Sequence, residues 1–163
     1  MPQSIAGVLD TLYTNLTTLF VGQTGTDGSP VLVTFGPPGQ YQPSAIVSIL
    51  DTTTQITRPT MGPNRSREMA ADVTAVISVY TPGDETQQQV STDNAFALLT
   101  VLESNLRTAP NERLGGASWD AWVSKADPVA TVVYAYSDDP NAPPVPTGRV
   151  TEITVTITTL IRY

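Results

Sequence analysis

The stretch RVTEITVTITTLIRY, residues 149–163, decides the fold class. Its aliphatic and hydroxyl side chains alternate, and a period of two is typical of a β-strand with one buried and one exposed face. The predicted buried face holds Ile153, Val155, Ile157 and Ile161, and the predicted outer face holds Thr154, Thr156, Thr158 and Arg162. Burying each aliphatic side chain would contribute about 1.5–3 kcal/mol before conformational entropy is subtracted. We therefore expect this strand to lie inside a sheet.

Upstream of this strand, helical and strand patterns follow one another. Residues 4–20 and 92–108 are predicted to be helices, because their apolar residues recur at spacings of three and four. Ser4 is the expected N-cap of the first helix, and Ser91 or Thr92 that of the second. Further strands are predicted over residues 31–35, 44–50, 69–80 and 129–136, with 117–123 either a strand or a loop.

The order of these elements favours an α+β fold. Strands that follow one another suggest hairpins, so we expect a mostly antiparallel sheet of four to six strands. Each helix has a single apolar stripe, and we expect both helices to pack on one face of the sheet. The other face would then meet water or a partner. The segments 51–67 and 138–148 are expected to be connections, and the length predicts a single domain over residues 1–163.

The composition excludes several kinds of chemistry. The chain has no cysteine and no histidine, which excludes disulfides, the thiolate and imidazole ligands of structural zinc, and histidine-based catalysis. Nothing singles out two of the fifteen acidic residues as a catalytic pair, and none of them stand at EF-hand spacing. We therefore expect a protein that is not an enzyme and has no catalytic, cofactor-binding or metal-binding residues.

The net charge of −7 bears on partners and location. It disfavours a general affinity for DNA or anionic lipid, because both need an excess of Lys and Arg. No apolar run approaches the ~20 residues that cross a bilayer. The first residues also lack the basic flank of a signal peptide. The expectation is a protein outside the membrane, made and used in a cytoplasm.

Two groups of residues are candidates for a subunit interface. Arg58, Arg65 and Arg67 lie within ten residues that hold no acid, whereas residues 1–57 hold three acids and no Lys or Arg. This basic segment could be a solvated loop, a weak DNA contact, or a clasp on an acidic patch of a neighbouring subunit, for which arginine is well suited. The second group is Trp119 and Trp122, a pair that could anchor a loop on the core, fill a subunit contact, or stack on a sugar or base.

Residues 103–116, ESNLRTAPNERLGG, carry a resemblance to a known family. They resemble the E-x-x-L-R-x-x-P-x-L-G-G turn of the tail terminator proteins of long-tailed, siphovirus-type actinobacterial phages, with a longer spacing here between Pro110 and Leu114. The basic polar segment, strand, PGD turn and helix before this turn are similar too, as is the alternating strand after it. The resemblance covers roughly residues 66–163.

The resemblance implies a structural protein of the virion neck. Tail terminators are small α/β proteins that form a hexameric ring at the head-proximal end of the tail tube. The ring stops polymerisation of the major tail protein and presents a surface to the head-side stopper or connector, while DNA passes through the bore without specific binding. On this expectation the chain is a homo-oligomer in the virion tail or neck, assembled in the host cytoplasm, and an acidic bore would let DNA slide.

Other functions remain open at this point. A head–tail completion or stopper protein and a tail tube subunit share the small size, the β-rich composition and the low charge. A small hydrolase would have to use Asp and Glu with the single lysine, Lys125. A monomeric binding module for a small ligand is a further alternative.

Overall fold

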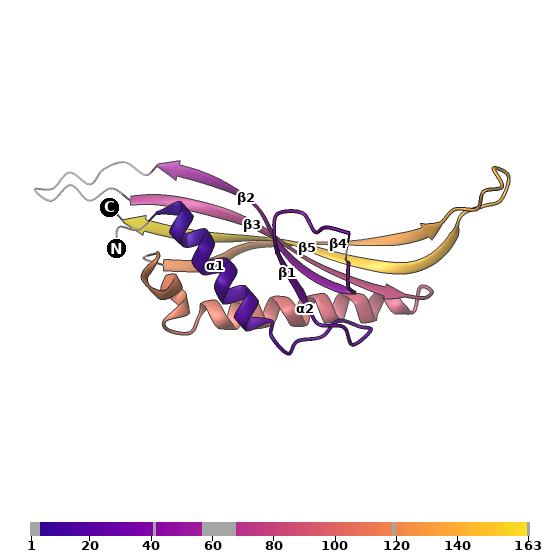
Figure 1. The fold of residues 1–163 in the computed structure, drawn as a ribbon, viewed down its shortest axis with the longest axis horizontal. Coiled ribbons are helices and arrows are strands. Elements are labelled where there is room, and N and C mark those ends of the chain that lie inside the picture. Colours follow the sequence, from indigo (N-terminus) through magenta and orange to yellow (C-terminus); the bar gives the residue numbers. More distant parts are fainter. Residues whose placement is uncertain (1–3, 41, 57–67, 119, 163) are drawn as a thin grey trace, which may run out of the picture.

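The computed structural model describes residues 4–40, 42–56, 68–118 and 120–162 (Figure 1). In chain order its elements are α1 (Ile5–Leu19), β1 (Leu32–Phe35), β2 (Ala45–Ile56), β3 (Glu68–Pro82), α2 (Gln87–Leu106), the 3-10 helix η1 (Asn111–Gly116), β4 (Asp120–Ala135) and β5 (Val145–Arg162). The strands form one five-stranded sheet in the order β1-β2-β3-β5-β4. β1 runs parallel to β2, and the other neighbouring pairs are antiparallel. The predicted α+β class with a mostly antiparallel sheet is confirmed.

β5 has the two faces that its sequence predicts. Its residues Ile153, Val155, Ile157 and Ile161 are completely buried. Thr154, Thr156 and Thr158 lie half-buried on the other face, and Arg162 is exposed. β3 beside it repeats the pattern, and its completely buried residues include Val73, Ala75, Ile77 and Val79. One face of the sheet therefore carries the core.

Both helices cover that face (Figure 1). α1 begins at its predicted N-cap, where the Ser4 hydroxyl accepts a hydrogen bond of 3.1 Å from the Gly7 N–H. α2 lies along β3 and β5. The buried helix residues that join the sheet in one core are Val8, Leu12 and Leu16 of α1, and Ala95, Leu98, Leu99, Leu102 and Leu106 of α2. No helix in the described ranges is both long and apolar enough to cross a membrane.

The start of the second helix differs from the prediction. α2 begins at Gln87, so neither Ser91 nor Thr92 is its N-cap. Ser91 is completely buried inside the helix. Its hydroxyl donates to the carbonyl of Val79 at 2.8 Å and bonds to Thr151 Oγ1 at 3.0 Å. A serine resembles a cap in sequence, but here its hydroxyl is satisfied by the sheet beneath the helix.

The strands are longer than predicted. Residues 51–56 continue β2 instead of forming a connection, because they pair with residues 69–74 of β3. Residues 117–123 and 129–136 were separate in the prediction, yet Asp120–Ala135 is one strand, β4. Pro128 stands in its middle, which is compatible with an edge strand, because the missing N–H is not needed on the open side.

A turn around Asp27 joins the segment after α1 to the start of β2. The carboxylate of Asp27 accepts hydrogen bonds from the Ser29 hydroxyl, the Ser44 hydroxyl and the Ser29 N–H. These bonds, with the Ser29 hydroxyl contributing most, lower the pKa of Asp27 from 3.8 to about 2. The Thr26 hydroxyl also donates to the carbonyl of Tyr80 at 2.7 Å. The loop is thus tied to two strands of the sheet.

Candidate subunit interface

The described residues hold no group of three or more Asp or Glu side chains that could bind a metal ion. Asp84 resembles Asp27, since hydrogen bonds from the Thr86 hydroxyl and then the Thr86 N–H lower its pKa. Both carboxylates accept hydrogen bonds from the residue two positions later, as acids that shape turns do, and Asp27 also accepts one from the Ser44 hydroxyl. Their lowered pKa values are therefore explained by hydrogen bonds that hold loops in place.

Of the five residues predicted for a subunit interface, the structure describes one. Arg58, Arg65, Arg67 and Trp119 lie outside the residues that the structure describes. Trp122 lies on β4, and 38% of its surface is exposed, which is more than a core anchor leaves open. It lines a hollow of about 160 Å³ together with Glu103, Leu106, Arg107 and Val123. The fold thus brings Trp122 of an edge strand to the C-terminal end of α2.

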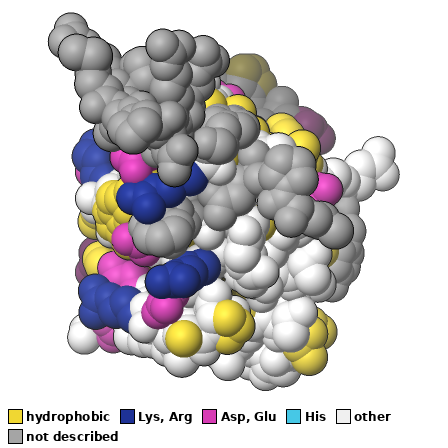
Figure 2. Space-filling view, turned by 90° about the vertical axis from the view of Figure 1, so that its left-hand side faces the viewer, with side chains coloured by type: hydrophobic (Ala, Val, Ile, Leu, Met, Phe, Trp, Pro, Cys, Tyr) yellow, Lys and Arg dark blue, Asp and Glu magenta, His cyan; other side chains and the backbone are white. Residues whose placement is uncertain are grey.

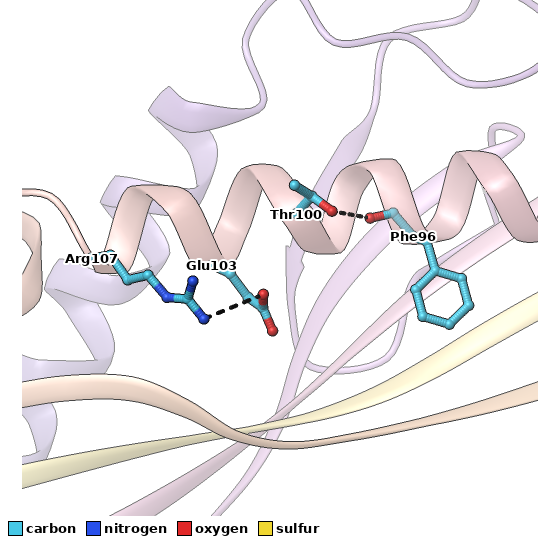
Figure 3. Close-up of polar contacts among 4 residues, drawn as sticks. All are labelled: Phe96, Thr100, Glu103 and Arg107. Carbon is cyan, nitrogen blue, oxygen red and sulfur yellow. Dashed lines mark hydrogen bonds and ion pairs between the residues drawn. The ribbon is translucent and has the colours of Figure 1, made fainter.

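The side of α2 next to this hollow carries an exposed ion pair. Arg107 Nη2 lies 3.8 Å from Glu103 Oε2, one helical turn away, and the arginine side chain is 79% exposed. Figure 3 shows Glu103 and Phe96 projecting to the same side of α2, with Phe96 41% exposed. A pair of this kind contributes only about 0.3–0.5 kcal/mol to stability. Arg107 is therefore available to an outside acceptor at little cost to the fold.

The other flank of α2 is hollowed as well. An open hollow of about 400 Å³ lies between α2 and the end of α1. The residues that line it are Leu19, Thr100, Val101, Ser104, Asn105, Thr108 and Asn111. The Thr100 hydroxyl donates to the carbonyl of Phe96 at 2.9 Å, so it is satisfied within the helix (Figure 3). The hollow mixes aliphatic and neutral polar groups without any ionisable one.

The second feature of the surface is a projecting hairpin, residues 127–147, which we call the arm. It consists of the second half of β4, the start of β5 and their connection. Residues 127–133 still pair with the part of β5 that lies beside β3, and residues 134–147 extend beyond the ends of α2 and β3 (Figure 1). None of its residues is buried. Its exposed large apolar side chains are Val129 (56% exposed), Tyr134 (44%), Tyr136 (80%) and Val145 (60%). Apolar side chains gathered on a surface in this way are typical of a region that a partner covers.

The root of the arm is anchored at Gly148. A Cβ atom on this residue would lie 2.4 Å from the ring of Tyr80, which crosses β5 from β3 at this point. The glycine therefore leaves room for the aromatic ring. Beyond this point the two strands of the arm support only each other, and a two-stranded hairpin alone is marginally stable in water.

Sequence reasoning missed the arm. It predicted the strand at 129–136 and a proline-rich connection at 138–148, but it did not predict that residues 134–147 would project beyond the other strands. β5 begins at Val145, so the connection itself is shorter than predicted. One feature of the sequence could have indicated the arm: the predicted apolar strand at 129–136 is followed by no predicted helix that could cover it.

The two ends of the molecule differ in charge. The arm end carries Asp138 and Asp139 in the hairpin connection, and Asp84 and Glu85 in the turn after β3. Figure 2 views the opposite end, where Lys and Arg side chains gather beside Asp and Glu side chains. Basic residues of elements that finish toward this end are Arg107, Arg113 and Arg162. The arm end also holds Arg149, whose Nε donates to the Asp84 carbonyl, and the opposite end pairs Arg107 with Glu103 and Arg162 with Glu68. Acidic side chains therefore occur at both ends, and Arg107, Arg113 and Arg162 belong to the end opposite the arm.

A scan against protein-family models finds no match to this chain, and a search of curated proteins finds no similar sequence.

Proposed function

We propose that this chain is a structural virion protein that forms a ring at the head-proximal end of a phage tail tube. There it would end tube polymerisation and join the tail to the head connector. The observation that supports this best is the arm, a hairpin whose valine and tyrosine side chains are exposed. The resemblance of residues 66–163 to tail terminators supplies the position in the virion.

The uncovered face of the sheet supports the same proposal. Thr74 and Ser78 of β3 and Thr154 and Thr156 of β5 lie half-buried on it, and their side chains are short and hydroxylated. Thr158 beside them donates to Asp72 at 2.6 Å. A face of this kind suits packing against another subunit, since its hydroxyl groups can form hydrogen bonds.

The acidic composition fits a ring through which DNA moves. The chain has a net charge of −7, so six copies would surround the bore with an excess of negative charge. DNA binds where Lys and Arg are concentrated, because these side chains neutralise phosphates and release the counterions around them. A bore lined by acidic side chains would instead repel DNA and let it pass.

The test is assembly of the purified protein. Light scattering and negative-stain electron microscopy should show hexameric rings, either free or capping one end of tubes assembled from the major tail protein of the same phage. Immunogold labelling of virions should place the chain at the junction of head and tail. A monomer that neither closes into rings nor binds a tube end would overturn the proposal.

The arginine-rich segment gives a sharper test of the ring contact. In the double variant Arg65→Glu and Arg67→Glu, rings should fail to form while far-ultraviolet circular dichroism stays unchanged. Lys125→Glu is the control, since it reverses a charge outside that stretch of sequence, at a residue that pairs with Asp127 on β4. Intact rings in the double variant would remove the arginine clasp and leave the proposed function standing.

A further inference from the structure

We infer that the arm of one copy docks on the α2 end of a second copy, where Trp122 and Arg107 receive Tyr136 and the acidic pair Asp138–Asp139. This inference rests on the proposed ring function and names the contact that would build the ring. The α2 end is defined by the residues of its hollow, Glu103, Leu106, Arg107, Trp122 and Val123.

The arm is built for recognition through its side chains. β4 is an edge strand, and an open edge can add a further strand through its backbone. However, Lys125 and Pro128 stand on this edge, and the register shifts between Val123 and Lys125 and again between Val133 and Tyr134. Charges, prolines and bulges of this kind protect an edge from strand addition. Since strand addition at this edge is disfavoured, we expect a partner to contact the exposed valine and tyrosine side chains of the arm.

The arm and the α2 end are chemically complementary. Tyr136 is 80% exposed, and the hollow beside the partly exposed Trp122 holds about 160 Å³. An aromatic ring in that hollow would lie against an indole and a guanidinium group, both of which stack on aromatic rings. Asp138 and Asp139 follow two residues later, and the Arg107 fork can pair with a carboxylate.

The placement of the two surfaces requires a second molecule. The arm extends from one end of the long axis, and α2 finishes toward the other end (Figure 1). One molecule therefore cannot join its own two surfaces. A contact between different surfaces of identical chains is head-to-tail, and its repetition closes a ring when the rotation allows. Because Tyr136 and Asp138–Asp139 belong to the same chain as Trp122 and Arg107, a second copy is the partner that this complementarity favours.

The size of the arm is adequate for such a contact. A standard interface involves about 20–30 residues on each side and buries about 800 Å² per partner. The arm, residues 127–147, has 21 residues, of which 134–147 project beyond β3, and none of the 21 is buried. The pairing of β4 with β5 lowers the cost of ordering the arm on binding.

Disulfide cross-linking tests the contact directly, because the chain contains no cysteine and each introduced thiol is unique. The Tyr136→Cys variant is mixed with the Glu103→Cys variant under mild oxidation. We expect a covalent dimer of the two chains, while a chain with both substitutions should give a ladder that ends at the ring size. Thr17→Cys, at an exposed position of α1, is the control partner and should form no link with Tyr136→Cys.

A charge exchange supplies the second readout. Arg107→Glu should slow the cross-link between these two cysteine variants about tenfold, because it places like charges opposite one another. Asp138→Lys and Asp139→Lys on the arm should restore the rate. Circular dichroism of each variant establishes that these exposed substitutions leave the fold intact.

The outcomes separate this inference from the proposed function. Rings without a link between the two thiols, or a Tyr136→Cys chain that links only to itself, would overturn the arm contact and leave the ring function standing. Links and rings that never bind a tail tube would support the arm contact and overturn the neck function. Absence of links, of rings and of binding to a tube end would overturn both.

Discussion

The two faces of β5 can be tested by exchanging neighbouring residues. Ile157 is completely buried, and it lies opposite Val73 of β3 and Val123 of β4. Thr156, the residue before it, lies half-buried on the uncovered face. The variants Ile157→Thr and Thr156→Ile make the same chemical change in opposite directions. Both residues are β-branched, so strand propensity changes little in either variant.

The expected costs follow from burial. Ile157→Thr removes two carbon atoms from the core, a loss of about 1.6 kcal/mol at about 0.8 kcal/mol each. It also buries a hydroxyl group, which costs about 1–3 kcal/mol when no partner is provided. The free energy of unfolding should therefore fall by about 2.5–4.5 kcal/mol. Thr156→Ile should change it by no more than about 0.5 kcal/mol, because that side chain reaches solvent.

Urea unfolding followed by circular dichroism measures both values. The Ile157→Thr midpoint should fall clearly while the slope of the transition stays the same. For a protein of this size, about 3 kcal/mol corresponds to a thermal midpoint roughly 6–12 °C lower. Similar losses in both variants would show that both faces are covered within one molecule. That result would refute the idea of a free face available to a neighbouring subunit.

Two further predictions concern the loops and the root of the arm. The hydrogen bonds to Asp27 lower its pKa from 3.8 to about 2, so their stabilisation is complete above about pH 4 and is lost as the pH falls toward 2. The difference in unfolding free energy between the wild type and Asp27→Asn should therefore shrink as the pH falls from about 4 toward 2, as measured by urea unfolding at a series of pH values. A constant difference would contradict the lowered pKa of Asp27. Gly148→Ala should cost about 1–3 kcal/mol in urea unfolding, since the new Cβ would meet the Tyr80 ring at 2.4 Å. Gly39→Ala, where nothing lies within 4 Å, is its control and should be nearly neutral.

The candidate interface was only partly predictable from sequence. Trp122 was predicted as a possible contact residue, because exposed tryptophans are common in interfaces. Its proximity to Arg107 was not predictable, since it depends on how β4 crosses the end of α2. The arm was missed for a related reason. Its strand pattern is local, but whether a strand is covered depends on elements far away in the chain.

The sequence by itself determined the character of each element. The alternation in β5 and the apolar stripe of α1 arise from side-chain periods of two and 3.6, which need no knowledge of the rest of the chain. Only the tertiary structure decided that β5 lies between β3 and β4, that β4 stands at the edge, and that their hairpin projects beyond the core. Strand order depends on pairing between distant segments, and local periodicity carries no information about which segments pair.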